Sequence, residues 1–427
     1  IALRAKHAGH NVRLFSRHNK DGSRSEIGDG LVQRVSDWED HMSWADLIFV
    51  TDNILYIHKL HAYKMKGYPI FGCDVEGRRW EQDRLYGDSM FQRAGIQTIP
   101  IEKFKSYDDA IAFITKNPKR YVSKPIGDGD KALSYCSKSP ADMIFMLQSW
   151  KKRGAYKGEF ILQEFHKGIE MAVGGWMGAG GFSQHFLENW EFKKLMNGDL
   201  GVATGEQGTI LRYTQESKLA DLVLKPLEGL LHGIGYVGYI DVNCIIDDSG
   251  IPWPLEFTTR PGWPLFQIQQ ALHKGDPIEW MLDALNGKDT LKVSKDVACG
   301  VVISMPDYPY GAVTKKENSG YPLFGLTEED LVGNIHASEV QKGKGPIFED
   351  GKIKMNQEML VTSGDYVCTV TGTGPMVEDA QEKCYDRIKK KIEIPNSIMY
   401  RTDIGCRLEK QLPELHKLGY CKDLEYC

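Results

Sequence analysis

The chain has 427 residues, of which 41% are hydrophobic and 26% charged, and it contains 44 glycines and 18 prolines. This composition is typical of a globular protein, and the length predicts two to four domains rather than a single core. A net charge of -5 and a pI near 6.2 argue against a nucleic-acid-binding protein, and no apolar run approaches the roughly 18 residues of a membrane helix.

Nine cysteines are scattered along the chain without a CxxC pair. This spacing fits neither a zinc site nor a dense disulfide framework, so we predict reduced thiols in a cytoplasmic protein. The sequence begins at Ile1 with a predicted helix and only then a strand, Asn11–Phe15. That order predicts a further strand ahead of Ile1.

The first 79 residues alternate strands with helices. Strand-like runs at Asn11–Phe15, Leu47–Val50 and Tyr68–Phe71 are separated by amphipathic stretches. This alternation is typical of a parallel sheet with helices on both faces. We therefore predict a Rossmann-like domain over residues 1–79, followed by a helix at Trp80–Ala94.

A lysine followed by a glycine-rich turn is the first candidate for chemistry. The predicted strand Tyr121–Pro125 carries Lys124 near its end, and Gly127–Lys131 is a polar, flexible turn. A lysine there can neutralise one nucleotide phosphate while loop amides reach the next. An ordinary surface loop is the competing interpretation.

The predicted strand Glu159–Phe165 leads through a turn to Glu170. A strand edge at this place can pair with adenine, and a carboxylate a few residues later can accept hydrogen bonds from ribose hydroxyls. A solvated surface turn is the alternative. With a helix at Ala141–Arg153, these elements form a predicted nucleotide-lid unit at about residues 118–172.

A predicted hairpin is the sharpest feature of the sequence. Its strands, Tyr239–Ile246 and Trp253–Phe257, are joined by the tight turn Asp247–Gly250. Hairpin strands lie side by side, so residues that share a face on both strands come close together.

Asp241 and Asn243 share one face of the first hairpin strand by period-two alternation, as do Glu256 and Thr258 on the second. The two strands can therefore direct several oxygen ligands at one spot, as magnesium requires. A solvent-exposed polar sheet face is the alternative, but it does not explain why the carboxylate of Glu256 stands between two apolar neighbours. Arg260 follows and offers a cation beside the metal.

The rest of the chain is interpreted from its glycines and strands. Gly198–Gly208 is expected to be a loop, followed by a helix at Ser217–Gly233. Further strands are predicted at Cys299–Ser304, Asn334–Ser338, Met359–Thr362 and Tyr366–Gly372. A helix at Val377–Lys391 precedes a final helical segment. We predict a central domain over residues 80–290 and a β-rich domain over residues 291–427.

The order of these parts resembles the ATP-grasp superfamily, and within it the phosphoribosylamine–glycine ligases. Matching segments are Trp80–Arg84 with Gly95–Thr98, Gln163–Glu170, Lys193–Lys194, Asp199–Gly205, Glu256–Pro264, His336–Ala337 and Arg401–Gly405. The last two are the most specific, because ATP-grasp enzymes in general need not carry them. The resemblance implies an α/β and α+β multidomain fold, with a Rossmann-like start, a two-subdomain ATP-grasp core and a small β-rich C-terminal domain.

The resemblance also implies the use of ATP and of Mg²⁺, or Mn²⁺ in its place, and it assigns roles to residues of this chain. ATP contacts are implied for Arg84, Lys124, Lys131, Gln163, Glu164, Phe165 and Glu170. Implied metal ligands are Glu256, Asn243 and Thr258, and implied catalytic residues are Arg260, Lys193 and Gly262. Substrate contacts are implied for Asp199, Thr204, Gly205 and Trp263. Gly127–Lys131 and Asp199–Gly208 are the expected lids that exclude water.

The chain departs from the family pattern where metal and acceptor meet. Thr258 stands in place of an asparagine, and because its hydroxyl is a weaker ligand, the metal is expected to lean on Asn243 or Asp241. Trp263 and Leu265 stand where the family has acids. Those changes remove partners for a cationic amine and add apolar bulk.

We therefore expect a cytoplasmic carboxylate–amine ligase, monomeric or homodimeric, that works through an acyl phosphate and has no nucleic-acid or membrane partner. Phosphoribosylamine and glycine, the substrates of the purine-biosynthesis enzyme, form the first substrate hypothesis. A divergent ligase with another amine or carboxylate is the second, favoured by Trp263 and Leu265. A nucleotide-binding protein without catalysis is the third, and Thr258 supports it.

Overall fold

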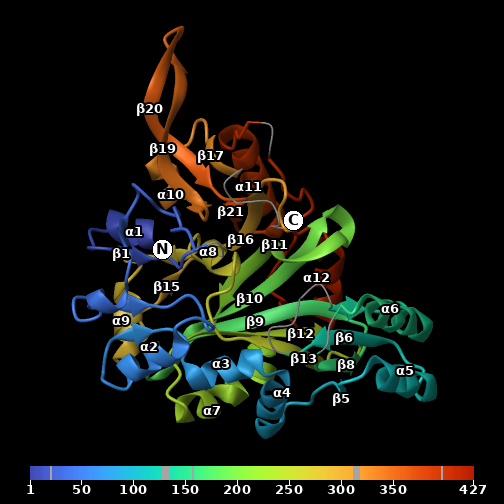
Figure 1. Ribbon diagram of the computed structural model, residues 1–427. Helices are drawn as coiled ribbons and strands as arrows, with labels where there is room; N and C mark the ends of the chain where they lie inside the picture. The colour runs from blue at the N-terminus through green and yellow to red at the C-terminus, as the bar shows by residue number, and fades with distance from the viewer. Residues whose placement is uncertain (20–21, 127–133, 156–157, 311–317, 396–397) are drawn as a thin grey trace.

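One large sheet runs through the centre of the molecule, with helices and smaller sheets around it and a two-stranded arm projecting from one end (Figure 1). The computed structural model describes residues 1–19, 22–126, 134–155, 158–310, 318–395 and 398–427. No helix in these ranges is long and apolar enough to cross a membrane. All nine cysteines are free thiols, as predicted.

The N-terminal segment pairs its strands in parallel, as predicted, but in two separate sheets. Its elements are α1 (Ala2–His7), β1 (Arg13–Phe15), β2 (Gln33–Val35), η1 (Glu39–His41), β3 (Ile48–Phe49), α2 (Ile57–Lys64) and β4 (Ile70–Phe71). β1 pairs with β2, and β3 pairs with β4. Each strand has only two or three residues, so the pairs do not merge into the continuous sheet that was expected.

The single helix predicted at Trp80–Ala94 is wrong, because two helices occupy the region. They are α3 (Val75–Gln82) and α4 (Arg84–Arg93). Asp83 between them has an extended backbone, with φ -104° and ψ 95°, and its carboxylate accepts a hydrogen bond from the Tyr86 amide. Aspartate favours this N-cap position over a helix interior, which explains the break.

A four-stranded sheet with two helices follows and forms a unit of its own beside the central sheet (Figure 1). Its elements are β5 (Ile101–Phe104), α5 (Tyr107–Lys116), β6 (Tyr121–Pro125), β7 (Tyr135–Cys136), α6 (Pro140–Arg153) and β8 (Phe160–Glu164). The strand order is β5-β8-β6-β7. Ile114, Leu147 and Leu162 belong to a separate apolar core between these helices and strands. The bounds of β6, α6 and β8 agree with the predicted ones within about one residue, whereas β5, α5 and β7 were not predicted.

The central sheet has eight strands in the order β13-β12-β9-β10-β11-β16-β21-β18. The elements that precede β16 are β9 (Ile169–Gly178), β10 (Gly181–Met196), η3 (Asn197–Asp199), β11 (Leu200–Thr214), η4 (Ala220–Leu224), η5 (Lys225–Leu227), α7 (Glu228–Gly233), β12 (Gly238–Ile246), β13 (Pro252–Thr258), α8 (Leu265–Gln269), β14 (His273–Lys274), α9 (Glu279–Leu285) and β15 (Lys292–Val293). The predicted hairpin is confirmed, since β12 and β13 pair antiparallel.

The loop expected at Gly198–Gly208 is wrong, whereas the lid role expected for Asp199–Gly208 stays a prediction. Most of this stretch belongs to β11, the second strand of a long hairpin with β10. Register shifts between Phe192 and Met196 accommodate the glycine-rich part of the partner strand. Pairing with β10 thus overrides the weak strand propensity of glycine.

The C-terminal elements continue the same sheet. They are β16 (Val297–Ser304), β17 (Ser319–Pro322), α10 (Glu328–Val332), β18 (Ile335–Ala337), β19 (Val340–Glu349), β20 (Lys352–Ser363), β21 (Tyr366–Gly374), α11 (Val377–Lys391) and α12 (Leu408–Lys417). β16 hydrogen-bonds to β11, so the central sheet crosses the boundary predicted at residue 290. β19 and β20 form the projecting arm in Figure 1, which was not predicted.

Candidate active site

Part of one face of the central sheet is polar, beside an apolar core on the same face, and its polar side chains come from alternate positions on four neighbouring strands. On β12, Ile240 and Val242 point into the main apolar core, so Asp241 and Asn243 face the other way. Gly174 on β9 leaves room there, since a Cβ at this position would lie 2.0 Å from the Tyr239 hydroxyl. The sequence pattern therefore creates a polar cradle on a sheet whose opposite face is apolar.

The strand register places the predicted metal-binding residues side by side. Asn243 pairs with Glu256, and Asp241 pairs with Thr258. The Asn243 amide nitrogen donates a hydrogen bond to Glu191 Oε2 at 3.1 Å, which adds a second carboxylate beside Glu256. Within the described ranges, no three His, Cys, Asp or Glu side chains gather as a ready metal site. The donor set therefore fits magnesium only where substrate phosphates complete the coordination, which is its usual mode of binding.

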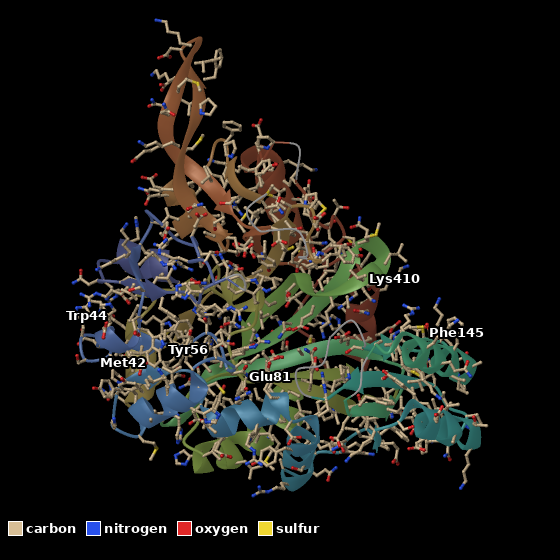
Figure 2. All side chains as sticks on the ribbon, viewed as in Figure 1. Met42, Trp44, Tyr56, Glu81, Phe145 and Lys410 are labelled. Atoms are coloured by element: carbon tan, nitrogen blue, oxygen red, sulfur yellow. The ribbon has the colours of Figure 1, made fainter. Side chains whose placement is uncertain are left out.

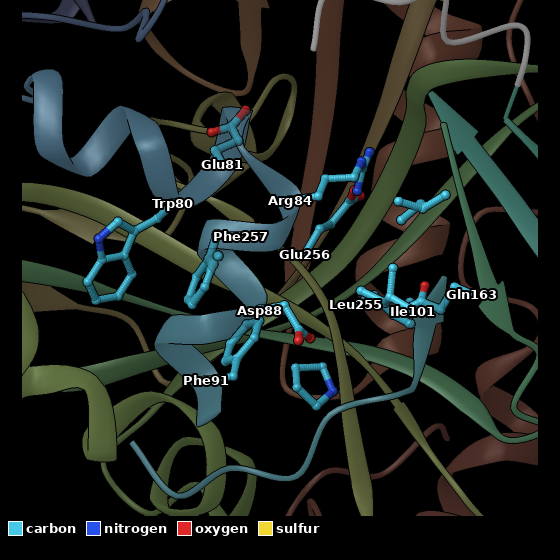
Figure 3. Close-up of a pocket in the computed structure, with 13 residues that line it drawn as sticks. Trp80, Glu81, Arg84, Asp88, Phe91, Ile101, Gln163, Leu255, Glu256 and Phe257 are labelled. Atoms are coloured by element: carbon cyan, nitrogen blue, oxygen red, sulfur yellow. The ribbon is translucent and has the colours of Figure 1, made fainter. Parts of the chain in front are cut away.

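Arg84 and Glu256 point toward each other across the cleft between α4 and β13 (Figure 3). Their Nη1 and Oε2 atoms are 2.8 Å apart. Burial acts to raise the pKa of Glu256, but Arg84, Lys124 and Lys193 outweigh it and hold the pKa well below its usual range. Glu256 is therefore an anion amid three cations, as a metal-binding carboxylate near phosphates must be.

Lys124 on β6 approaches the same carboxylate from the four-stranded sheet. Burial lowers the pKa of Lys124 to about 8, and the attraction of Glu256 opposes that shift. Arg84 and Lys193 are close enough to lower it further. A phosphate group placed among the three cations would relieve their mutual repulsion.

Lys193 on β10 bridges two carboxylates. Its Nζ lies 2.8 Å from Glu170 on β9 and 3.0 Å from Glu191 on its own strand. Burial acts to lower the pKa of Lys193, but these two acids and Glu256 raise it well above its usual value. Lys193 thus stays charged, and the residues predicted from five distant segments converge on one charged cluster: Arg84, Lys124, Glu170, Lys193 and Glu256.

Of the groups predicted to contact adenine, some are already bound to other protein groups. Gln163 is buried and lines the same cleft as Arg84 and Glu256 (Figure 3). The Glu164 carboxylate pairs with Lys119 at 2.5 Å, and the Phe165 amide donates to the Arg120 carbonyl oxygen at 2.9 Å. Among these groups, only the Gln163 side chain lines the cleft. Lys131 and the turn Gly127–Lys131 lie outside the described residues.

Arg260 is held at the opposite side of the cluster by Glu81, which Figure 2 places at the middle of the molecule. Arg260 Nη2 is 3.3 Å from Glu81 Oε1. Glu81 Oε2 accepts hydrogen bonds from the Asn53 side chain and from the Thr259 amide, both at 2.8 Å. Three segments far apart in the sequence thus fix the position of Arg260.

The predicted substrate residues on the β10–β11 hairpin are largely engaged with protein groups. The Asp199 carboxylate accepts a hydrogen bond from Arg401 at 2.9 Å. Thr204 donates from its hydroxyl to the Lys193 carbonyl oxygen at 2.8 Å. A Cβ at Gly205 would meet no atom within 4 Å. Arg401, from the C-terminal motif, is 1% exposed and also binds Asp403, so this motif secures the hairpin tip.

Gly262 and Trp263 come two and three residues after Arg260. A Cβ at Gly262 would lie 2.7 Å from the Leu265 Cβ, so the entry to α8 requires a glycine here. Trp263 is 53% exposed, with its ring centroid 5.6 Å from that of Tyr366. The catalytic role of Gly262 and the substrate contact of Trp263 remain predictions.

Two acids of this region, the partly buried Glu191 and the buried Glu206, were missed from the sequence. Glu191 belongs to the alternation Asn189, Glu191, Lys193 on β10, and that period-two pattern was a usable signal. Glu206 lay in the stretch that was expected to be a loop. Burial and the charge of Glu191 raise the pKa of Glu206 well above its usual value. The same two causes raise the pKa of Asp241 to about 7.

Comparisons with known proteins show which family this chain is similar to. Residues 298–407 match the family model described as phosphoribosylglycinamide synthetase, C domain. A phosphoribosylamine–glycine ligase from Ralstonia nicotianae is 27% identical over 367 residues, covering 81% of this chain and 80% of that protein. The predicted resemblance is confirmed. The chain is a divergent relative of the phosphoribosylamine–glycine ligases.

Solved structures agree in fold. A phosphoribosylamine–glycine ligase from Thermotoga maritima superimposes with a TM-score of 0.68 at 22% identity, covering 95% of this chain and 97% of that one. The biotin carboxylase domain of a 2-oxoglutarate carboxylase from Hydrogenobacter thermophilus gives 0.58 at 12% identity, covering 93% and 88%. This relative of the ligases therefore has the multidomain α/β ATP-grasp fold that its sequence predicted.

Proposed function

We propose that the chain is an ATP- and Mg²⁺-dependent carboxylate–amine ligase that acts through an acyl phosphate. The observation that carries the proposal is the convergence of three cations on Glu256 in one cleft, with Arg84 at 2.8 Å and Lys124 and Lys193 close enough to depress its pKa. A cluster with this balance of charge suits phosphoryl transfer, which depends mainly on positioning and charge neutralisation.

In this proposal ATP lies along the cleft, with adenine near Gln163 and its phosphates near Arg84, Lys124 and Lys193. Glu256, Asn243 and Glu191 would hold Mg²⁺, with Thr258 as a weak additional oxygen. Bound magnesium would neutralise the phosphate oxygens during transfer, and Mn²⁺ can take its place. Glu170 fixes Lys193 in its observed position and remains a candidate for the ribose hydroxyls.

The protein groups would then act on the carboxylate substrate. Arg260 orients its carboxylate, held in place by Glu81. A carboxylate oxygen attacks the γ-phosphorus of ATP and ADP leaves. The amine nitrogen attacks the acyl carbon, phosphate is expelled and the nitrogen loses one proton. Arg260 also stabilises the oxyanion of the tetrahedral intermediate.

Phosphoribosylamine and glycine are the first substrate pair to test, because the relatives carry that ligase name. A second candidate is a ligase with a different carboxylate, which is favoured by the exposed Trp263 beside the acceptor side of the cleft. The nine free thiols support a reducing, cytoplasmic location. Monomer and homodimer both remain compatible with this proposal.

The experiment is ADP release by the full chain with ATP and Mg²⁺, across a panel of amines paired with carboxylates. The panel includes phosphoribosylamine with glycine. Release that requires both an amine and a carboxylate supports a ligase, and the active pair identifies its substrates. Release with no pair, despite nucleotide binding by calorimetry, would refute catalysis and favour a binding protein.

A further inference from the structure

Three aromatic side chains from distant parts of the sequence meet beside Arg260. Trp263 follows β13, Tyr308 follows β16, and Tyr366 begins β21. The ring centroid of Tyr366 is 5.6 Å from that of Trp263 and 5.6 Å from that of Tyr308. Both separations fall in the range of favourable ring pairs. The three rings form a packed cluster, tilted against one another by 46° and 68°, which we call the aromatic wall.

The aromatic wall is connected to the charged cluster. The Tyr308 hydroxyl lies close enough to the side chains of Thr204 and Gln207 for both to lower its pKa against the effect of burial. Thr204 in turn donates to the carbonyl oxygen of Lys193 at 2.8 Å. The wall therefore adjoins the β10–β11 hairpin that carries Lys193 of the proposed phosphate site.

Exposure differs sharply along the wall. Tyr366 is 8% exposed and forms its floor, whereas Trp263 is 53% exposed between the buried residues Gly262 and Pro264. A single exposed tryptophan is ordinary on a protein surface. A tryptophan packed on a buried tyrosine next to a charged cluster instead presents a rigid, flat apolar surface to a ligand.

Glu206 gives an independent indication of a ligand at this place. It is 5% exposed, and within the described residues its Oε1 atom has no hydrogen-bond partner. It lies close enough to Tyr308, Tyr366 and Arg260 to interact with each of them electrostatically. Buried carboxyl oxygens are rarely left unpaired, so a group from outside the protein is expected to meet this one.

We propose that the aromatic wall binds an aromatic or other planar apolar group of the carboxylate substrate, whose carboxylate faces Arg260 and Glu206. The inference rests on the proposed ligase function and names the class of its carboxylate. Guanidinium groups bind carboxylates through paired hydrogen bonds. Burial and the neighbouring Glu191 raise the pKa of Glu206 well above its usual range, which favours the neutral form that can donate a hydrogen bond to a substrate oxygen. The wall supplies no cation for a sugar phosphate, whereas ring stacking suits a flat apolar group.

Direct binding by calorimetry tests this without turnover. The full chain, saturated with Mg²⁺ and a non-hydrolysable ATP analogue, is titrated with 3-phenylpropionate and with propionate. We expect the aromatic acid to bind at least about tenfold more tightly, as one well-packed ring provides. In Trp263→Ala that preference is lost, in Trp263→Phe most of it is kept, and Tyr308→Ala reduces it.

Trp44→Ala is the matched control, because Trp44 is also exposed, at 41%, but belongs to the N-terminal segment (Figure 2). It should leave both acids unaffected. Equal binding of the two acids by the wild type, or a preference that survives Trp263→Ala, would overturn the inference. Failure of the ATP analogue to bind at all would instead overturn the proposed function.

Discussion

The two ends of the candidate site differ in chemistry and in how closely they follow the ligase pattern. At the phosphate end, charged side chains are interlocked: Arg84 with Glu256, and Lys193 with Glu170 and Glu191. At the acceptor end, aromatic rings lie near Arg260 and Glu206, and Trp263 is largely exposed. Activation of a carboxylate by ATP imposes the same electrostatic demands for any substrate, whereas the group that the carboxylate carries is free to change.

The strongest test of this contrast is Glu256→Ala. The substitution removes the carboxylate expected to hold Mg²⁺ and leaves Arg84 and Lys124 unpaired, so ADP release should fall by about 10³-fold or more. Steady-state kinetics with the active substrate pair measures it. Asp248→Ala in the turn of the same hairpin is the control and should retain full activity, since that side chain is exposed. Full activity of Glu256→Ala would remove the metal assignment.

Lys124→Ala should weaken nucleotide binding at the phosphate end of the site and leave the acceptor end unaffected. Loss of a partly buried cation facing phosphates should weaken binding of an ATP analogue by about 100-fold. Calorimetry provides the affinity, and Lys167→Ala, at an exposed lysine near the same sheet, should leave it unchanged. An unaltered affinity in Lys124→Ala would mean that the phosphates bind elsewhere.

Trp263→Asp should weaken substrate binding at the acceptor end of the site and leave the phosphate end unaffected. It restores the acid found in the ligase pattern, so binding of an aromatic carboxylate should weaken by about tenfold while nucleotide affinity stays constant. Competition between 3-phenylpropionate and glycine in the ADP-release assay measures the change in selectivity. If the wild type already uses glycine with phosphoribosylamine efficiently, Trp263 does not mark a changed substrate.

The smallest effect expected is a pH dependence of nucleotide binding. Because burial lowers the pKa of Lys124 to about 8, the lysine is charged below that pH and loses its proton above it. Affinity for the ATP analogue should therefore fall by about fourfold between pH 7 and pH 8.5. Lys124→Arg, which keeps its charge, should show a flat profile over that interval. A steep profile in that variant would assign the titration to another group.

Much of this arrangement was predictable because the signals are local. Period-two alternation along β12 and β13 was enough to predict the hairpin, its two faces and the proximity of Asn243 to Glu256. The break at Asp83 and the strand at Leu200–Thr214 were not predictable in this way. The break depends on the preference of Asp83 for an N-cap position over a helix interior. The strand depends on long-range pairing that overrides the weak strand propensity of glycine.

The aromatic wall could not be predicted from the sequence for a similar reason. Trp263 was identified as a departure from the family pattern, but nothing local connects it to Tyr308 or Tyr366, which lie far along the chain. Glu206 was hidden in the stretch taken for a loop. Side chains gathered by sheet topology have no spacing signature, so their proximity emerges only when the strand order is known.

The continuous central sheet has a consequence for how the protein is made. β11 has β16 as its neighbour, and β16 pairs with β21, which ends at Gly374. During synthesis the chain must therefore wait for residues far downstream before the free edge of β11 is covered. Until then a partly folded nascent chain exposes an unpaired strand edge, which is a site where chaperones bind or chains associate.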